Sequence, residues 1–224
     1  MKRFFSIFFI MMAAISAAKA QPSLDAVVPI NIEKIQAIES NGKLYFVSEN
    51  GRFVFQGQLT DSWHKKSLDT IDEIRYAASH INLDVMGLPL DDLNTITIPG
   101  GPERIVVFVD PQCPYCKTFI NDAKKKTDKY TFKIIVVPAL GDKSNALSKS
   151  LFCASDKRNA LNLMMTNKLD TLAQKTNCDT KHYDLTLTVA QLFGIRSVPY
   201  FISPDGRYRA GAGKDFWTWV DKQE

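Results

Sequence analysis

The stretch that decides the fold of this chain is RIVVFVDPQCPYCK, residues 104–117. It begins with β-branched and aromatic residues and stops at Asp110-Pro111, which is the pattern of a buried strand that ends in a turn. Two cysteines, Cys113 and Cys116, follow almost at once. A strand that delivers a C-x-x-C pair to the start of a helix is typical of a thiol–disulfide redox site.

The two cysteines are expected to have different roles. Cys113 stands where the first turn of the helix leaves backbone N–H groups unpaired, and these groups and the helix dipole stabilise a thiolate. Pro114 suits the first helical position, where its missing donor costs nothing, and Tyr115 completes the dipeptide between the cysteines. We therefore expect Cys113 to be an exposed nucleophile that forms a mixed disulfide with the substrate, and Cys116 to be the thiol that resolves it.

A second part of the expected site is SVPYF, residues 197–201, which follows a predicted helix and precedes a predicted strand. A proline is allowed at the entrance of a strand, and in this context we expect the Val198-Pro199 bond to be cis. The ring of Pro199 would then face Cys113 and leave the backbone of Val198 free to pair with an extended substrate. The alternative is an ordinary trans proline that opens a strand.

Other polar residues carry weaker signals. Asp110 is expected to cap the active-site helix or to hold its loop, and the alternative is that it assists proton transfer from Cys116. His64, His80 and His182 are far from both cysteines in the sequence, so nothing local supports a Cys–His hydrolase.

The remaining cysteines, Cys153 and Cys178, lie in a predicted helical segment. Four cysteines could in principle bind one zinc ion, but a structural zinc site normally offers a second close pair, and His182 does not restore that spacing. We expect no metal and no cofactor. In an exported protein these two residues favour a structural disulfide, with two buried free thiols as the alternative.

The first twenty residues have the pattern of a cleaved signal peptide. Lys2 and Arg3 precede the apolar run Phe4–Ala18, and Ala18-Lys19-Ala20 fits the small-x-small cleavage rule. An uncleaved membrane anchor is the alternative, but the run is shorter than the roughly 20 residues that span a bilayer. Export implies an oxidising compartment. Without this basic segment the remainder of the +4 chain is nearly neutral, so nothing suggests nucleic acid as a partner.

The N-terminal part of the mature chain predicts a small module, residues 21–62. Between residues 31 and 60, β-rich runs alternate with Asn41-Gly42 and Asn50-Gly51, the strongest short-range hairpin signal. A module of this size buries little core alone, so we expect a second copy of the chain to cover it. The alternative is that it packs on the large domain of its own chain.

A linker helix is expected next, within residues 63–90, and then a large domain of residues 91–224. Ser67–Ile81 has an apolar stripe at helical spacing, with Ser67 as its cap. The strand–helix–strand order around Cys113 predicts parallel pairing, and residues 143–193 are expected to be a helical insertion. The expected strands of the large domain are Thr95–Ile98, Arg104–Val109, Thr131–Pro138, Tyr200–Ser203 and one near Tyr208–Ala210.

The motifs FVDPQCPYC, SVPYF and SNGKLYFVSENGRFVFQG together resemble the periplasmic disulfide isomerases of the DsbC/DsbG type. The resemblance implies an α/β thioredoxin fold with a helical insertion, joined by a linker helix to an N-terminal antiparallel β, cystatin-like module that forms a V-shaped homodimer. It also implies a cis bond at Pro199, a disulfide between Cys153 and Cys178, and a membrane reductase of the DsbD type as redox partner.

Two positions differ among the relatives that the chain resembles. The dipeptide Pro114-Tyr115 is that of DsbG-like members, whereas DsbC-like isomerases carry Gly-Tyr. Val198 stands where those isomerases have threonine and DsbA-type oxidases have valine. We expect a periplasmic disulfide isomerase or reductase that rearranges incorrect disulfides in exported proteins. The alternatives are a DsbA-like dithiol oxidase and a dimeric chaperone that acts without its thiols.

Overall fold

The computed structural model describes residues 34–222. The predicted signal peptide and the beginning of the mature chain lie outside the described residues. The described chain starts with an antiparallel sheet in the order β1-β2-β3, made of β1 (Ile35–Ser40), β2 (Lys43–Ser48) and β3 (Val54–Gln56). Asn41 and Gly42 both have positive φ in the first turn, as the Asn-Gly signal predicts. The expected meander is therefore present.

The expected single helix from Ser67 to Ile81 is wrong. The structure has a hairpin of β4 (Leu59–Asp61) and β5 (Lys66–Leu68), then the short helices α1 (Ile71–Ala77) and α2 (Leu83–Met86). Ser67 pairs with Thr60 inside the hairpin, and Thr70 caps α1 by accepting from the Glu73 N–H at 3.2 Å. No residue of α1 is fully buried, so its apolar stripe lacks the packing that would extend a helix.

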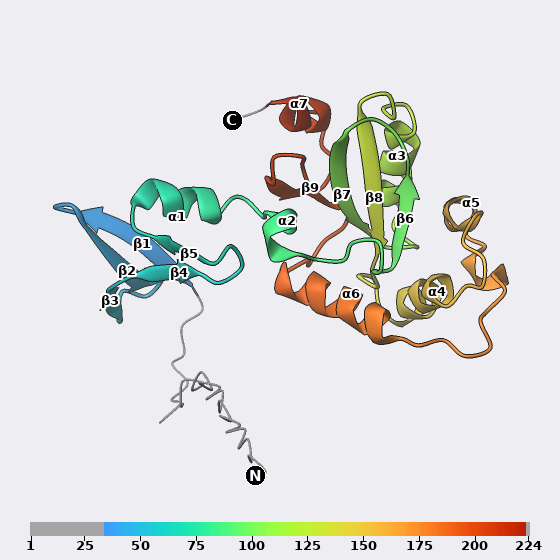
Figure 1. The fold of residues 1–224 in the computed structure, drawn as a ribbon, viewed down its shortest axis with the longest axis horizontal. Helices are drawn as coiled ribbons and strands as arrows, with labels where there is room; N and C mark the ends of the chain where they lie inside the picture. Colours follow the sequence, from blue (N-terminus) through green and yellow to red (C-terminus); the bar gives the residue numbers. More distant parts are fainter. Residues whose placement is uncertain (1–33, 223–224) are drawn as a thin grey trace, which may run out of the picture.

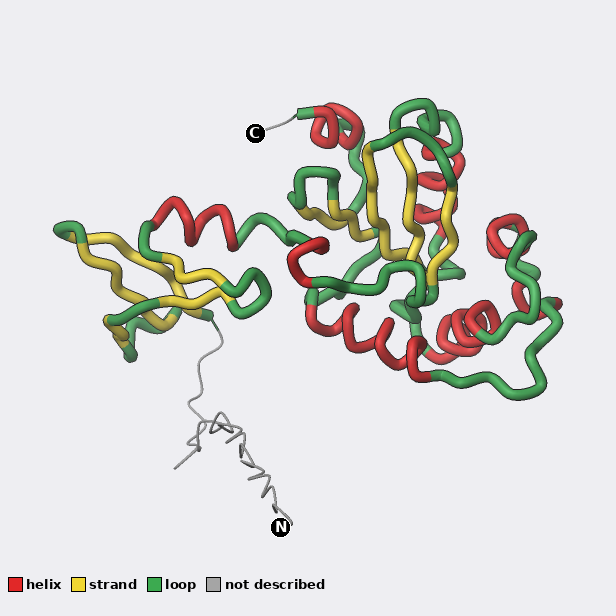
Figure 2. Tube along the Cα trace, viewed as in Figure 1, coloured by secondary structure: helices red, strands yellow, loops and turns green. Residues whose placement is uncertain are grey.

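The large domain is built on a mixed sheet in the order β10-β9-β7-β8-β6 (Figures 1 and 2). Its strands are β6 (Thr95–Ile98), β7 (Glu103–Val109), β8 (Tyr130–Val136), β9 (Tyr200–Ile202) and β10 (Tyr208–Ala210). β7 and β8 are parallel, which confirms the pairing expected around the cysteines, and the other neighbours are antiparallel. The two central strands are buried on both faces because helices cover each side.

Helices divide between the two faces of this sheet. α3 (Pro114–Ala123) and α7 (Phe216–Asp221) pack on one face with the helical insertion's α4 (Asp142–Phe152), α5 (Ala160–Met165) and η1 (Leu169–Thr171). α6 (Lys181–Leu192) packs on the other face. The insertion is thus a set of short helices rather than one long one. The helix predicted after Cys113 was expected to continue over residues 118–129, but α3 ends at Ala123 and the lysines that follow form turns.

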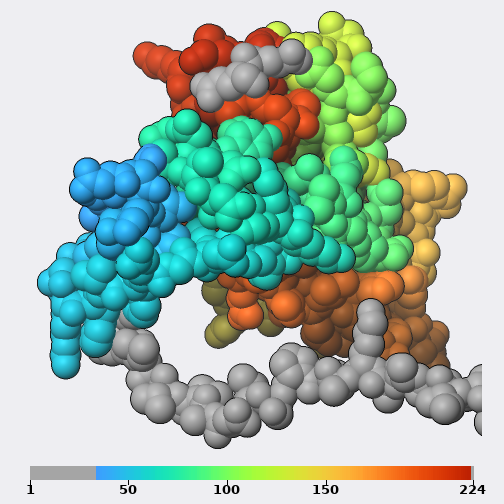
Figure 3. All heavy atoms as spheres, turned by 60° about the vertical axis from the view of Figure 1, so that its left-hand side comes forward, coloured from blue at the N-terminus to red at the C-terminus, as the bar shows by residue number. Residues whose placement is uncertain are grey.

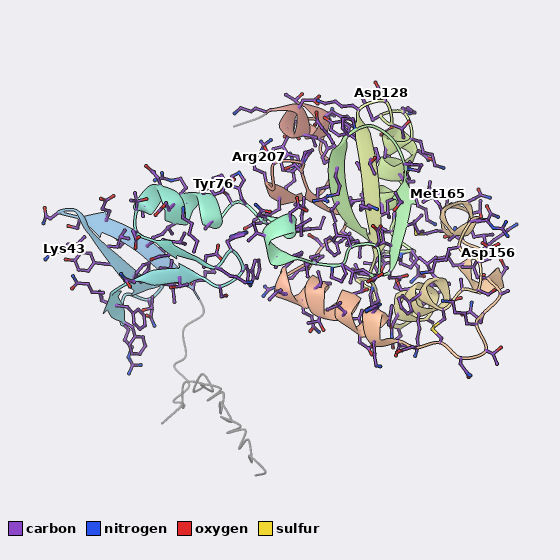
Figure 4. The ribbon with its side chains drawn as sticks, in the orientation of Figure 1. Lys43, Tyr76, Asp128, Asp156, Met165 and Arg207 are labelled. Carbon is purple, nitrogen blue, oxygen red and sulfur yellow. A yellow bond between two sulfur atoms is a disulfide. The ribbon has the colours of Figure 1, made fainter. Side chains whose placement is uncertain are left out.

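The N-terminal sheet projects to one side of the large domain, and the linker lies against the C-terminal segment (Figure 3). The Ile81 N–H donates to the Gly206 carbonyl at 2.8 Å, and the Tyr208 hydroxyl donates to the Ala78 carbonyl at 2.7 Å. Figure 4 labels Tyr76 on the linker side of this joint and Arg207 on the domain side. Within residues 34–222, no helix has the length and apolar character needed to cross a bilayer.

Candidate active site

The redox pair stands at the junction of β7 and α3. β7 runs through the core, its side chains from Ile105 onward are almost fully buried, and it ends at Val109, just before Asp110. Cys113 is the N-cap of α3, and its sulfur accepts a hydrogen bond from the Cys116 N–H at 3.2 Å. Pro114 occupies the first helical position, as expected. The sulfur of Cys113 therefore occupies the anion position that the helix start provides.

The expectation that Cys113 is exposed is wrong. Its residue surface is 3% exposed and that of Cys116 is 1%, whereas Tyr115 between them is 76% exposed. The loop before β9 covers Cys113, whose thiol lies 3.7 Å from the carbonyl oxygen of Val198. A disulfide that reaches Cys113 must therefore enter beside this loop.

The covering loop contains the cis peptide bond Val198-Pro199. Its position is fixed at its end, because the Gly211 N–H donates to the Pro199 carbonyl at 2.8 Å. The side chain of Val198 packs against the buried apolar side chains on both faces of the large domain's sheet. Of the two residues predicted to bind substrate, Val198 thus faces Cys113, and Pro199 follows it in the same loop.

A groove of about 530 Å³ opens beside this loop. Its lining is mostly apolar or aromatic, and it carries one acidic and one basic side chain, Asp122 and Lys214. Among its other lining residues are Tyr115, Phe119, Val198, Pro199, Phe216 and Trp217. The groove runs from Tyr115, which lies between the two cysteines in the sequence, past the cis proline to the start of α7.

Cys116 lies deeper than Cys113. Burial raises the pKa of the Cys116 thiol far above its usual value, and the hydrogen bond and charge shared with Cys113 raise it further. Cys116 is therefore a poor acid in the reduced protein. A buried and weakly acidic Cys116 fits its predicted role as the resolving cysteine.

A buried polar network surrounds Asp110, and the sequence reasoning found only part of it. Asp110 does not cap α3, because Cys113 does. Its carboxylate instead accepts from the Gln112 N–H at 2.7 Å, the Ser144 hydroxyl at 2.8 Å and the Leu140 N–H at 2.9 Å. Ser144 stands 34 residues after Asp110 on α4, and its sequence neighbourhood has no motif that would have marked it.

Cys153 and Cys178 form a disulfide with a Cα–Cα distance of 5.5 Å. It links the end of α4 to the segment before α6, within the helical insertion. Because Cys153 is bonded to Cys178, a zinc ion bound by all four cysteines is ruled out. Cys113 and Cys116 are the free cysteines, and residues 34–222 contain no cluster of His, Cys, Asp and Glu that could hold a metal ion.

Comparison with known proteins supports the chemistry of this site. A family model described as a thioredoxin-like domain matches residues 91–217, more than half of the chain. The thiol:disulfide interchange protein DsbC of Haemophilus influenzae is 26% identical over 180 residues, which cover 78% of this chain and 72% of that protein. DsbG of Pseudomonas aeruginosa is 23% identical over 186 residues, with the same coverages.

Two further comparisons cover less of the relatives or show the fold alone. Several other DsbC relatives align over less than half of their own length. The crystal structure of a disulfide interchange protein from Neisseria gonorrhoeae matches with a TM-score of 0.50 at 24% identity, covering 61% of this chain and all of that one. At that identity the structural match shows the fold.

The fold, the C-x-x-C pair at a helix start and the family match agree with one another. The residues of the site are those of a thiol–disulfide oxidoreductase. The chain belongs to the thioredoxin-like family, and its curated relatives include the thiol:disulfide interchange proteins DsbC and DsbG.

Proposed function

We propose that this protein is a periplasmic disulfide isomerase or reductase that acts on misoxidised exported proteins. The observation that carries the proposal is the geometry of Cys113. Its sulfur caps α3 and faces the Val198 carbonyl, while the resolving thiol of Cys116 lies buried behind it. Cys113 is the attacking residue and Cys116 the resolving residue.

The reaction begins at the Cys113 thiolate. It attacks one sulfur of a substrate disulfide, so that a Cys113–substrate S–S bond forms while the other substrate cysteine leaves as a thiolate. In isomerisation that thiolate attacks a second disulfide of the substrate, and the thiolate released last attacks the mixed disulfide and returns Cys113 to its starting state. No net oxidation or reduction occurs.

Reduction uses Cys116 instead. Its thiol loses a proton to solvent, its sulfur attacks Cys113, and the substrate cysteine leaves as a thiolate that takes up a proton. The Cys113–Cys116 disulfide that results requires an external reductant, for which we propose a membrane reductase of the DsbD type. Burial, the largest cause of the raised pKa of Cys116, also acts in the mixed disulfide, so this exit is expected to be slow and to give a substrate time to rearrange.

The substrate is proposed to lie along the cis-proline loop. Val198 presents a carbonyl oxygen toward Cys113, and the apolar groove beside Pro199 can accept a hydrophobic side chain near the substrate cysteine. Such residues are exposed in unfolded rather than in native proteins. The groove therefore favours misfolded chains as substrates.

The N-terminal module is proposed to form a homodimer. Its sheet leaves large apolar side chains uncovered in a single chain, namely Ile35, Ile38, Val54 and Phe55. Among the described residues, β1 and β3 are also the edge strands of the three-stranded sheet. A second copy would cover both features. On this proposal residues 1–20 are a signal peptide, 21–62 the dimerisation module, 63–90 the linker and 91–224 the catalytic domain.

A second candidate function is a chaperone that works without its thiols. The apolar groove beside Pro199 favours it, because a dimer would present two such grooves that could hold an unfolded chain without thiol chemistry. Suppression of aggregation that persists after both Cys113 and Cys116 are replaced by alanine would identify this activity. The two functions are compatible.

The deciding experiment is the refolding of a protein with scrambled disulfides. Wild type should restore the native disulfides, and Cys113→Ala should lose this ability while it keeps its fold. Equal rescue by Cys113→Ala would exclude the proposed chemistry. Thiol trapping in the exported protein then distinguishes the possible activities. A mostly reduced Cys113–Cys116 pair supports an isomerase or reductase, and a mostly oxidised pair supports a DsbA-like oxidase.

A further inference from the structure

The groove beside the cis-proline loop is lined by two charged side chains, which differ in how they are paired. Asp122, on α3, accepts from the Lys125 ammonium at 2.9 Å, so a neighbouring cation offsets its charge. Lys214 stands in the loop before α7 and is exposed. Among residues 34–222 its ammonium has no carboxylate partner and no hydrogen bond. The groove therefore presents an uncompensated positive charge.

The acidic residues that flank this end of the groove are bound by other cations. Asp215, which follows Lys214 in the chain, is held by the Arg209 guanidinium at 3.0 Å. Asp221, on α7, accepts from the Lys129 ammonium at 2.6 Å. Neither ion pair includes Lys214, so its charge is available to a group that enters the groove.

A second lysine and two aromatic rings complete this end of the groove. Lys126, in the turn after α3, has its ammonium 5.5 Å from the centroid of the Trp217 ring. The Trp217 ring is stacked on that of Phe119, and both residues line the groove. An apolar side chain can pack on these rings, while the two lysines attract a carboxylate. The groove thus combines an apolar surface with positive charge.

The segment between the cis-proline loop and Lys214 consists of small residues. The Gly211 N–H donates to the Pro199 carbonyl at 2.8 Å. Ala212 and Gly213 follow it along the groove. None of these three residues has a side chain larger than a methyl group. Lys214 is therefore the first long side chain that follows the contact with Pro199.

We propose that Lys214 is a specificity-determining residue that selects substrate segments with a carboxylate close to the apolar side chain held in the groove. The inference rests on the proposed function and names the substrate class of the same site, namely cysteines flanked by a large apolar residue and an acidic residue. Complementary charge at the rim of a binding site mainly speeds association and favours one partner over another. The preference should therefore appear in the rate at which Cys113 attacks.

The test follows the first covalent step with short peptides whose single cysteine forms a disulfide with an aromatic thiol. The Cys113 thiolate attacks the peptide sulfur, and a Cys113–peptide S–S bond forms. The aromatic thiol has the lower pKa and leaves as a thiolate that absorbs visible light. The second-order rate constant at limiting peptide concentration measures recognition.

The peptides differ only in charge. Each has blocked ends, a leucine beside the cysteine and one variable residue, which is glutamate, glutamine or lysine. The variable residue is placed in turn at each position within four residues of the leucine. All other residues are uncharged, so a difference in rate reports the charge of the variable residue and its position.

At low ionic strength we expect wild type to react about threefold faster with the glutamate peptide than with the glutamine peptide, and more slowly with the lysine peptide. This is the size of effect that an exposed charge pair gives, and high salt should remove it. Lys214→Gln should lose most of the preference. Lys214→Glu should reverse it and favour the lysine peptide.

The matched control is Lys43→Glu. Lys43 is also exposed and lies on the N-terminal sheet, outside the groove (Figure 4). Its replacement changes the net charge of the protein by the same amount as Lys214→Glu and should keep the wild-type order of the peptides. A reversal in Lys43→Glu would assign the effect to net charge and overturn the inference. Circular dichroism confirms that each variant is folded.

The outcomes distinguish this inference from the proposed function. If wild type releases no aromatic thiolate from any peptide, Cys113 is not the proposed nucleophile, and both proposals are wrong. If wild type reacts but does not discriminate between the three charges at any position, the inference alone is wrong. The same conclusion follows if Lys214→Glu keeps the wild-type order.

Discussion

The strands of the catalytic domain and those of the N-terminal sheet differ in how much of their side-chain surface is buried. β7 and β8 lie between two helical layers, and their apolar side chains have almost no exposed surface. Among residues 34–222 the N-terminal sheet has no helical layer of comparable size, and every residue of β3 is exposed. Within the same residues the catalytic domain buries both faces of its central strands, whereas the N-terminal sheet leaves large apolar side chains exposed.

This difference separates two kinds of stability. Side chains buried within one chain stabilise the fold at any protein concentration. If a second copy buries the apolar side chains of the N-terminal sheet, as proposed above, they stabilise the fold in a concentration-dependent way. Substitutions in the two regions should therefore differ in size and in their dependence on concentration.

The largest effect is expected from Phe201→Ala. Phe201 is fully buried in β9, with ring centroids 4.6 Å from Phe119 and 4.4 Å from Phe216. Its truncation should lower the free energy of unfolding by about 3–5 kcal/mol, measured by denaturant titration. Val54→Ala is the counterpart in the sheet, since Val54 is 61% exposed.

The comparison predicts how the second variant behaves. At low protein concentration Val54→Ala should change the unfolding free energy by less than about 0.5 kcal/mol. In sedimentation it should weaken self-association. If wild type is monomeric at every concentration tested, or if Val54→Ala is as destabilising as Phe201→Ala, the contrast between the two regions is wrong.

The second largest effect is expected from removing the disulfide of the insertion. The Cys153–Cys178 bond closes a loop with a sequence separation of 25, so the double variant Cys153→Ser, Cys178→Ser should lose about 3 kcal/mol of stability. The redox pair lies on α3, outside this loop. Rapid reaction of Cys113 should therefore persist at temperatures where the variant is folded, and its loss there would mean that the insertion shapes the pair more than the structure indicates.

The sequence predicted the catalytic domain well because its signals are local. A run of β-branched residues, a turn and a capped helix need only neighbours in the chain, and β6 lies at the predicted Thr95–Ile98. The linker was mispredicted because Ser67 and Leu68 pair with the strand at Leu59–Thr60. A periodic apolar pattern does not reveal such a competing partner.

The candidate site shows the same limit. Cys113, Cys116 and the Val198-Pro199 loop carry motifs, so they could be named in advance. The burial of Cys113 arises from its packing against the loop before β9, and the contact of Ser144 with Asp110 arises from the packing of the insertion. A serine in an amphipathic helix carries no sign of its partner, and the partner becomes visible only when α4 is placed against the loop.

A smaller effect is expected at the joint between the two regions, from Gly206→Ala. Gly206 has a φ of 94°, and an added Cβ would lie 2.9 Å from the Ile81 carbonyl oxygen. A side chain there is strained and also pushes the linker away, at a cost of about 1–3 kcal/mol. We expect faster hydrogen exchange around Ile81, with β7 and β8 protected as in wild type. Equal loss of protection in the core would place the joint within one cooperative unit with the domain.

The smallest effect on stability is expected from replacing Asp205, the acidic residue next to Gly206. Burial alone would raise the pKa of Asp205, but hydrogen bonds from Ser203 and Arg207 outweigh it and hold the pKa below its usual value. A carboxyl group with a lowered pKa in the folded state stabilises the protein above the unfolded pKa near 4. That contribution is lost as pH falls through the folded value.

Asp205→Asn should therefore be less stable than wild type at pH 7, by about 1 kcal/mol or less because the Asp205–Arg207 pair is partly exposed. The gap between the two proteins should narrow as the pH is lowered from about 5 toward 2. Thermal melting across this range measures it. A gap that stays constant would show that Asp205 acts on the turn through its geometry and not through its charge. The stability of the joint between the linker and the large domain would then be independent of pH, like that of the apolar core. The difference between the catalytic domain and the N-terminal sheet would then rest on the burial of apolar side chains alone.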